Sequence, residues 1–177
     1  MSRHTFLKTL MLAHNKITVA TGLSSLQYLN VLDLSFNKLT SIEGLLGLNI
    51  QELNLEGNQI ESLVGLDKLP RLTSLNISSN RIVTLAPLAG CAHLTFLDAR
   101  KNLVPFIRQL EHLDSLPWLR TLYFYDNPAS FKPFYRSRVL YRLHKLVQLD
   151  HTPVSAEEKV RAYNAYGDPE GRGDLSE

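Results

Sequence analysis

Residue types that carry out catalysis occur in this sequence, but their spacing does not assemble a known active site. Cys91 and His93 stand two positions apart, a spacing that suggests a thiolate beside an imidazole. Cys91, however, occupies a position at which neighbouring segments of the same pattern carry Leu48 and Leu69. We therefore expect Cys91 to be a small buried side chain and not a reactive thiol.

Two further groups of charged residues have the spacing to share one face or edge of a strand, namely Asp98 with Arg100 and Glu52 with Glu56. Paired carboxylates act as general acid and base when a pocket shifts their pKa values, and the sequence shows no such pocket. The phosphate-loop, dinucleotide-binding, zinc-protease and serine-hydrolase signatures are absent. The sequence therefore predicts a protein that is not an enzyme, with no cofactor, metal or small-molecule substrate.

Composition narrows the class of protein further. Hydrophobic residues make up 44% of the 177 residues, charged residues make up 20%, and the net charge is +2, which excludes a disordered chain and a strongly basic nucleic-acid binder. The single cysteine excludes a disulfide framework and fits a reducing compartment, so we expect a cytoplasmic protein. No apolar run reaches the ~18 residues of a membrane span, so we expect no membrane partner.

Internal repetition is the strongest signal in the sequence. Each copy has an apolar residue, two variable residues, leucine, one variable residue, a second inner residue that is apolar in most copies, two more residues and then asparagine. The six copies read LKTLMLAHN, LNVLDLSFN, IQELNLEGN, LTSLNISSN, LTFLDARKN and LRTLYFYDN. Inner residues two positions apart predict a short strand with one buried face. The apolar residues that follow each asparagine at intervals of three predict a tight helical turn on the opposite side.

The recurring asparagine has a physical role of its own. Its short side-chain amide can bond backbone carbonyls and amides that a turn would otherwise bury without partners. Because the asparagines recur about every 22 residues, we expect identical turns to stack into a ladder.

This pattern resembles the leucine-rich repeat family, in its short intracellular class, over about residues 6 to 150. The resemblance implies an α/β fold, a curved leucine-rich repeat solenoid with a parallel sheet on the concave face and short helices or turns on the convex face. We assign six repeats to residues 1–127. Few residues precede the first copy, so its core is expected to lack a cap, which predicts a longer chain or self-association through this repeat.

Residues 128–152 resemble the C-terminal leucine-rich-repeat cap found in the spliceosomal A-prime protein and in the leucine-rich-repeat light chain of axonemal dynein. Within it we expect a helix with Pro133 at its first position. A second short helix is expected over 153–167, because Ser155 and Glu158 have the spacing of a capping box, and Val160, Tyr163 and Tyr166 form a stripe that would fold back on the cap. Residues 168–177 are expected to form a flexible tail.

The variable positions beside the inner leucines must face outward on the concave side. Small, polar and acidic residues occupy the early and middle copies, whereas the last two copies bring aromatic residues and arginine together, and such residues are common interface anchors. The predicted partner-binding residues are Asp33, Glu52, Glu56, Phe96, Asp98, Arg100, Tyr123 and Tyr125. The cap adds a candidate basic surface for RNA, an acidic protein tail or solvent alone, made of Lys132, Arg136, Arg138, Arg142 and Lys145.

Size limits what this face can bind. Six strands about 4.8 Å apart span about 24 Å, the length of a ~16-residue helix. We therefore expect the partner to be a protein that places a helix or an extended peptide on the concave face. A face of ~500 Å² is smaller than the ~800 Å² per partner of a standard interface, so a stable complex needs a second contact surface.

The resemblance of the cap and the following segment to ciliary proteins implies a cytoskeletal or ciliary scaffold or assembly factor, located in a cilium or flagellum and associated with dynein or microtubules. Two alternatives stay open at this point. The repeat class also resembles a regulatory subunit of a protein phosphatase, and the spliceosomal resemblance implies a component that assembles an RNA–protein complex. Nucleic acid itself is not an expected direct partner, because the chain has neither the charge nor the stacked aromatic platform.

Overall fold

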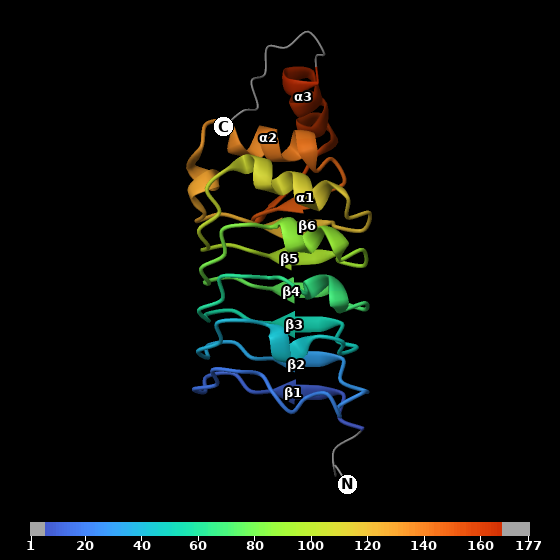
Figure 1. Cartoon of the computed structure of the whole chain (residues 1–177). Coiled ribbons are helices and arrows are strands. Elements are labelled where there is room, and N and C mark those ends of the chain that lie inside the picture. Colours follow the sequence, from blue (N-terminus) through green and yellow to red (C-terminus); the bar gives the residue numbers. More distant parts are fainter. Residues whose placement is uncertain (1–5, 168–177) are drawn as a thin grey trace.

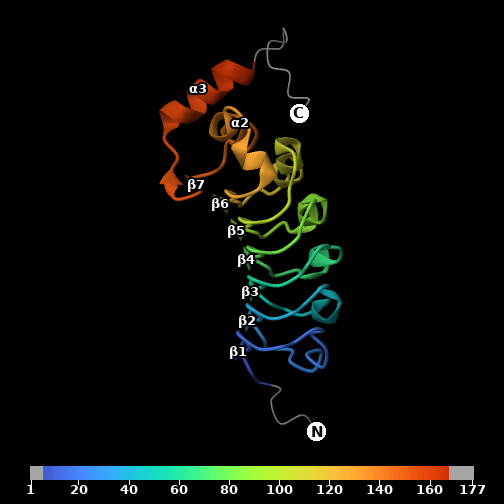
Figure 2. The ribbon, with the colours of Figure 1, turned by 90° about the vertical axis from the view of Figure 1, so that its left-hand side faces the viewer.

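A single sheet runs through the whole computed structural model, which describes residues 6–167 (Figure 1). Its eight strands lie in sequence order, and β1 to β7 are parallel while β8 is antiparallel. The strands are β1 Thr9–Met11, β2 Val31–Asp33, β3 Glu52–Asn54, β4 Ser74–Asn76, β5 Phe96–Asp98, β6 Thr121–Tyr123, β7 Gln148–Leu149 and β8 Thr152–Pro153. Figure 2 shows the strands along one side of the solenoid and the helical turns along the other, as the repeat pattern predicted.

The register explains why the pattern folds in this way. Each strand places its central leucine opposite that of the next strand, as Leu32 does with Leu53 and Leu53 with Leu75. These three side chains are at most 2% exposed. Burying one leucine contributes about 2 kcal/mol, so stacking the repeats stabilises strands that are too short to persist alone.

Short 3₁₀ helices return the chain along the convex side, in agreement with the spacing of apolar residues by three. They cover Glu43–Leu45, Leu66–Lys68, Ala86–Gly90 and Ile107–Leu110, and a further 3₁₀ helix, Pro128–Phe131, follows Asn127 directly at the start of the cap. The repeat that ends at Asn127 is longer than the others, and its additional residues form helix α1, Glu111–Asp114, directly after a 3₁₀ turn. The predicted solenoid fold is thus confirmed, and Cys91 is 3% exposed within its core.

The asparagine ladder is present as expected. Asn80 donates from Nδ2 to the carbonyls of Leu55, Ile77 and Ser78 at 2.9, 3.1 and 3.1 Å, and its Oδ1 accepts the amide of Ile60 at 3.0 Å. Two of these partners belong to the preceding repeat. From Asn37 onward, each asparagine therefore closes its own turn and joins it to the turn of the preceding repeat.

The residue before each asparagine adopts a left-handed conformation, and in one copy this residue is a glycine, Gly57. Its φ there is 67°, and the equivalent residues in the other copies have φ between 53° and 58°. The six are His14, Phe36, Gly57, Ser79, Lys101 and Asp126. A Cβ on Gly57 would lie 2.6 Å from the Phe36 ring, so close contact with this ring favours glycine here, whereas the other copies adopt the same conformation without glycine.

The cap consists of the β7–β8 hairpin and the helices α2, Tyr135–Arg142, and α3, Ala156–Tyr166. Leu149 in β7 pairs with Leu122 in β6, so the cap extends the parallel sheet by one strand. The prediction that Pro133 begins a helix was wrong. Phe134 has φ 57°, which interrupts any helical run from Pro133, and α2 begins at the next residue, Tyr135. The expected tail, 168–177, lies outside the described residues.

Helix α3 begins at the predicted capping box, in which Ser155 and Glu158 each accept a backbone amide of the other. Arg136 then holds this end of α3 against α2. It donates to both carboxylate oxygens of Glu158, at 2.7 and 3.2 Å, and to the carbonyls of Leu149 and Pro153 at 3.2 and 2.9 Å.

This contact makes the docking of α3 sensitive to acid. The paired Arg136 guanidinium, followed by the Ser155 amide, lowers the pKa of Glu158 from 4.5 to about 2. A lowered folded-state pKa means that the stabilisation is complete above about pH 4.5 and is lost as the pH falls towards 2. We expect the protection factors of the α3 amides, which correct for the intrinsic pH dependence of exchange, to fall across that interval before those of the repeats. Glu158→Gln keeps the cap but removes the charge, so the protection factors of its α3 should be independent of pH in this range. An identical pH response in both proteins would contradict this role of Glu158.

Candidate functional site

The concave face has an outward column that fixes the backbone after each strand. Oδ1 of Asp33, Asn54, Asn76 and Asp98 accepts the amide two residues further on, at distances between 2.8 and 3.2 Å. A short side chain with an acceptor oxygen is required for this bond. Two of the predicted binding residues, Asp33 and Asp98, therefore have a structural role that the sequence analysis did not identify.

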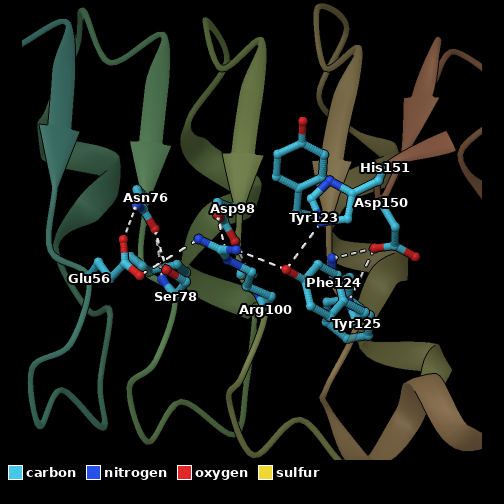
Figure 3. A network of polar contacts seen from close by, with 12 residues as sticks. Glu56, Asn76, Ser78, Asp98, Arg100, Tyr123, Phe124, Tyr125, Asp150 and His151 are labelled. Carbon is cyan, nitrogen blue, oxygen red and sulfur yellow. Dashed lines mark hydrogen bonds and ion pairs between the residues drawn. The ribbon is translucent and has the colours of Figure 1, made fainter. Parts of the chain in front are cut away.

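Arg100 lies at the centre of a polar network on this face (Figure 3). Its Nε lies 3.0 Å from Asp98 Oδ2, and one terminal nitrogen lies 3.6 Å from Glu56 Oε1. The other terminal nitrogen donates to the Tyr125 hydroxyl at 2.8 Å. Glu56 and Arg100 come from repeats that are not adjacent, and they meet because the intervening residue at the same level is the small, buried Ser78.

Burial gives this network its energetic weight. Asp98 is 4% exposed, and burial raises the pKa of its carboxyl above 3.8 although the amide and charge of Arg100 oppose the shift. Burying a carboxylate without a counter-ion costs free energy, so Arg100 is needed to neutralise Asp98. Its guanidinium is therefore not free to bind a partner protein. The predicted anchor Arg100 is thus largely occupied within the chain.

The predicted aromatic residues form one cluster over β5 to β7. Phe96 and Tyr123 meet edge to face with ring centroids 5.5 Å apart. His151, which the sequence analysis missed, lies 5.1 Å from the Tyr123 ring and 5.3 Å from the Tyr125 ring, with its Nε2 3.2 Å from the Tyr125 hydroxyl. His151 follows a strand that continues the repeat register beyond the sixth copy, and recognising that strand in the sequence would have placed it here.

A shallow hollow of about 260 Å³ lies over the other half of the concave face. Its lining comes from β1 to β4 and includes Met11, Val31, Asp33, Glu52 and Ser74. Met11 is 62% exposed, and Glu52 is also exposed. The concave face is therefore filled at its C-terminal half and open at its N-terminal half, a division that the sequence did not predict.

The predicted basic surface of the cap is divided by its contacts. Arg136 is held by Glu158, and Arg142 forms a 2.6 Å ion pair with Glu111 while its side chain is only 15% exposed. Arg138 also has a partner. Lys132 is half-buried and Lys145 is exposed. These five basic residues therefore do not form one continuous positively charged surface.

A further hollow, of about 670 Å³, lies at the cap between α1, α2 and α3. Val160 and Tyr163 line it and are 58% and 66% exposed, so of the predicted apolar stripe of α3 only Tyr166 packs against the cap. The helix docks through buried Ala162, through Arg136 and through a contact between the Tyr141 and Tyr166 rings.

The candidates for catalytic chemistry do not converge. Burial and the charge of Asp67 raise the pKa of Cys91 to about 11, which keeps its thiol protonated at neutral pH. Within residues 6–167, no three histidine, cysteine, aspartate or glutamate side chains are grouped so that they could hold a metal ion. No helix in that range is long and apolar enough to cross a membrane.

A stacked parallel sheet with one exposed, patterned face defines a solenoid repeat protein of the kind that presents a rigid surface for binding. A family model described as "Leucine-rich repeat" matches residues 30–175, and a second, described as "Leucine Rich repeats (2 copies)", matches residues 5–47. The chain belongs to the leucine-rich repeat family. Proteins of this family and fold are typically non-enzymatic modules for protein interaction.

Two curated relatives illustrate the range of the family. Cilia- and flagella-associated protein 410 of Mus musculus is 34% identical over 64% of this chain and 47% of its own length. U2 small nuclear ribonucleoprotein A' of Aspergillus fumigatus is 29% identical over 88% of this chain and 64% of its own length. The chain thus spans less than half of the ciliary relative.

Solved structures confirm the fold. An internalin, inlF, of Listeria monocytogenes superposes with a TM-score of 0.71 at 24% identity, covering 89% of this chain and 46% of the internalin chain. The Drosophila melanogaster SNF/U2A' complex contains a chain that superposes with a TM-score of 0.62 at 23% identity, covering 93% of this chain and 84% of the other.

Proposed function

We propose that this protein is a scaffold or assembly factor of the cilium or flagellum that binds a helix or an extended peptide of a partner protein on its concave face. The open hollow over β1 to β4 carries this proposal, because it is a preformed recess on an ordered surface. A prearranged surface loses little conformational entropy on binding, so a few contacts can give specificity. The ciliary assignment is supported by the similarity to cilia- and flagella-associated protein 410.

The two halves of the face have different roles in this proposal. The hollow receives a side chain from the partner, and exposed Glu52 at its lining favours a partner with a cation nearby. The cluster of Phe96, Tyr123 and His151 forms a rigid aromatic surface at the C-terminal half of the concave face, because ring contacts within the chain hold it in place. The partner is therefore bound by insertion at the N-terminal half and by surface packing at the C-terminal half.

The test is to fill the hollow. Ser74 lines it and is half-exposed, so Ser74→Trp should occupy the recess while the core stays intact. We expect the wild-type chain, purified with an affinity tag from ciliated cells, to retain axonemal proteins, and the Ser74→Trp chain to lose them by about tenfold in abundance. Lys101→Ala, an exposed substitution away from the hollow, is the matched control. Equal recovery by all three chains would contradict the proposed site, and the absence of axonemal proteins with wild type would contradict the ciliary role.

A second candidate function is the assembly of an RNA–protein complex. The observation that favours it is the 88% of this chain that aligns with U2 small nuclear ribonucleoprotein A' of Aspergillus fumigatus. The same purification distinguishes the two, because this role requires ribonucleoprotein components that are lost with Ser74→Trp but retained after ribonuclease treatment.

A further inference from the structure

One lateral edge of the solenoid has no acidic residue in the loops that lead into β2 to β7. This edge is formed by the loops that lead into the strands, and parallel pairing aligns each loop with the next. Neither aspartate nor glutamate occurs in these loops, which cover residues 24–30, 47–51, 70–73, 91–95, 115–120 and 144–148. Arg71, His93, Arg120 and Lys145 do occur there. We call these loops the basic edge.

Two hollows lie side by side on the basic edge, and Arg71 lines both of them. One, of about 390 Å³, is lined by Gln51, Pro70, Arg71, Thr73, His93, Thr95 and Trp118. The other, of about 490 Å³, includes Gln27, Tyr28 and Asn49. Neither lining contains a carboxylate, and Arg71 is exposed. An anion in either hollow would therefore meet cations and amides without opposing charge.

Exposed aromatic rings lie at the two ends of this double hollow. Trp118 is 55% exposed at one end and Tyr28 is 54% exposed at the other. Arg120, beside Trp118, donates to the carbonyls of Pro117 and Leu119 at 3.1 and 3.0 Å, so its contacts leave its charge uncompensated. Tryptophan, tyrosine and arginine are the residue types that most often dominate binding interfaces.

We propose that the basic edge is a second binding surface and that it takes an extended acidic peptide with apolar side chains at two positions. The loops that carry Tyr28 and Trp118 are four strand spacings apart, about 19 Å. At about 3.3 Å per residue, an extended peptide covers that distance in six residues. The peptide places one apolar side chain on each ring and directs its carboxylates between them to Arg71 and Arg120.

The same geometry argues against a single-stranded nucleic acid on this edge. Such strands are held by aromatic side chains on which successive bases stack. Here the Tyr28 ring is stacked on Phe6, with centroids 5.4 Å apart, and Trp118 stands four strand spacings away at the other end of the double hollow. The lining residues include Gln27, Asn49 and Gln51, whose amides suit a peptide backbone. A second surface also supplies the contact area that the concave face alone lacks for a stable complex.

The proposal is tested with a fluorescein-labelled peptide that has phenylalanine at each end and five alternating glutamates and aspartates between them, measured by fluorescence anisotropy against the full chain. We expect binding that weakens with salt and that falls about tenfold in Arg71→Glu and about fivefold in Trp118→Ala. Both residues are exposed, so neither change removes a buried contact. Lys101→Glu makes the same charge change on the opposite edge and should bind like wild type.

Three results would overturn the proposal. The peptide could fail to bind at millimolar concentration, or Lys101→Glu could weaken it as much as Arg71→Glu does, which would show nonspecific attraction. A labelled oligouridylate could bind more tightly than the peptide and be lost in the same variants, which would assign the edge to nucleic acid. This test does not involve the concave face, and Ser74→Trp should leave peptide binding unchanged.

Discussion

Replacing Asn80 with alanine should lower the free energy of unfolding by about 3 kcal/mol, because it removes a buried group with four backbone partners. The Ile60 amide would then lie in the core without a partner, and the carbonyls of Leu55 and Ile77 would each keep one side-chain bond, from Asn58 and Asn102 respectively. Water cannot reach them, since the surrounding side chains are almost fully buried. Urea unfolding followed by circular dichroism measures the loss.

Asn15 provides the matched control, because it has the same position in the first repeat. It is exposed and donates only to the Leu12 and Ala13 carbonyls, at 3.0 and 3.1 Å. Asn15→Ala should therefore cost less than about 1 kcal/mol. If the two substitutions destabilised the chain equally, the asparagine would act within its own turn, and its links between repeats would contribute nothing.

The fold could be predicted from sequence because the same pattern of residues recurs in each repeat. A central leucine in the strand, an apolar residue every third position in the return and an asparagine at the turn together determine register, burial and backbone partners. The exceptions are positions where the chain departs from this pattern. Phe134, in a left-handed conformation, displaced the start of α2, and neither its type nor its neighbours indicated this.

The candidate site was less predictable for a physical reason. The positions within the repeat show which residues face outward. They do not show which of these residues form hydrogen bonds or ion pairs with one another. Arg100 was predicted to be an interface anchor, and the structure shows it bound to Asp98, Glu56 and Tyr125. The N-terminal hollow is a property of several small side chains together, and no single residue in it indicates a site.

Two surfaces with opposite charge follow from this arrangement. The open half of the concave face carries Asp33 and Glu52, whereas the basic edge carries Arg71 and Arg120. The strand starts of β3 and β4 separate the two, so one partner could contact both through a turn. In that case the hollow-filling and edge variants would each weaken the same complex, and their effects on its free energy would add if the sites are independent.

Replacing Arg100 with methionine should destabilise the chain by about 2 kcal/mol at pH 7, because it leaves the Asp98 carboxylate buried without its counter-ion. Methionine preserves most of the apolar stem of arginine, so packing changes little. Thermal and urea unfolding measure the loss. Adding Asp98→Asn should restore at least half of the stability, since asparagine already makes the same turn bond in the equivalent positions Asn54 and Asn76.

The pH dependence distinguishes this electrostatic cause from simple loss of contact. Burial raises the pKa of Asp98 above 3.8 even with Arg100 present, and removing Arg100 removes the charge that opposes the shift. A raised folded-state pKa favours the protonated native state, so the penalty is complete above that pKa and disappears as the pH falls towards 3.8. The deficit of Arg100→Met relative to wild type should therefore shrink between pH 7 and pH 4, and the double variant should show no such change. A deficit that stayed constant with pH would mean that Arg100 stabilises the sheet by packing and by its bond to Tyr125.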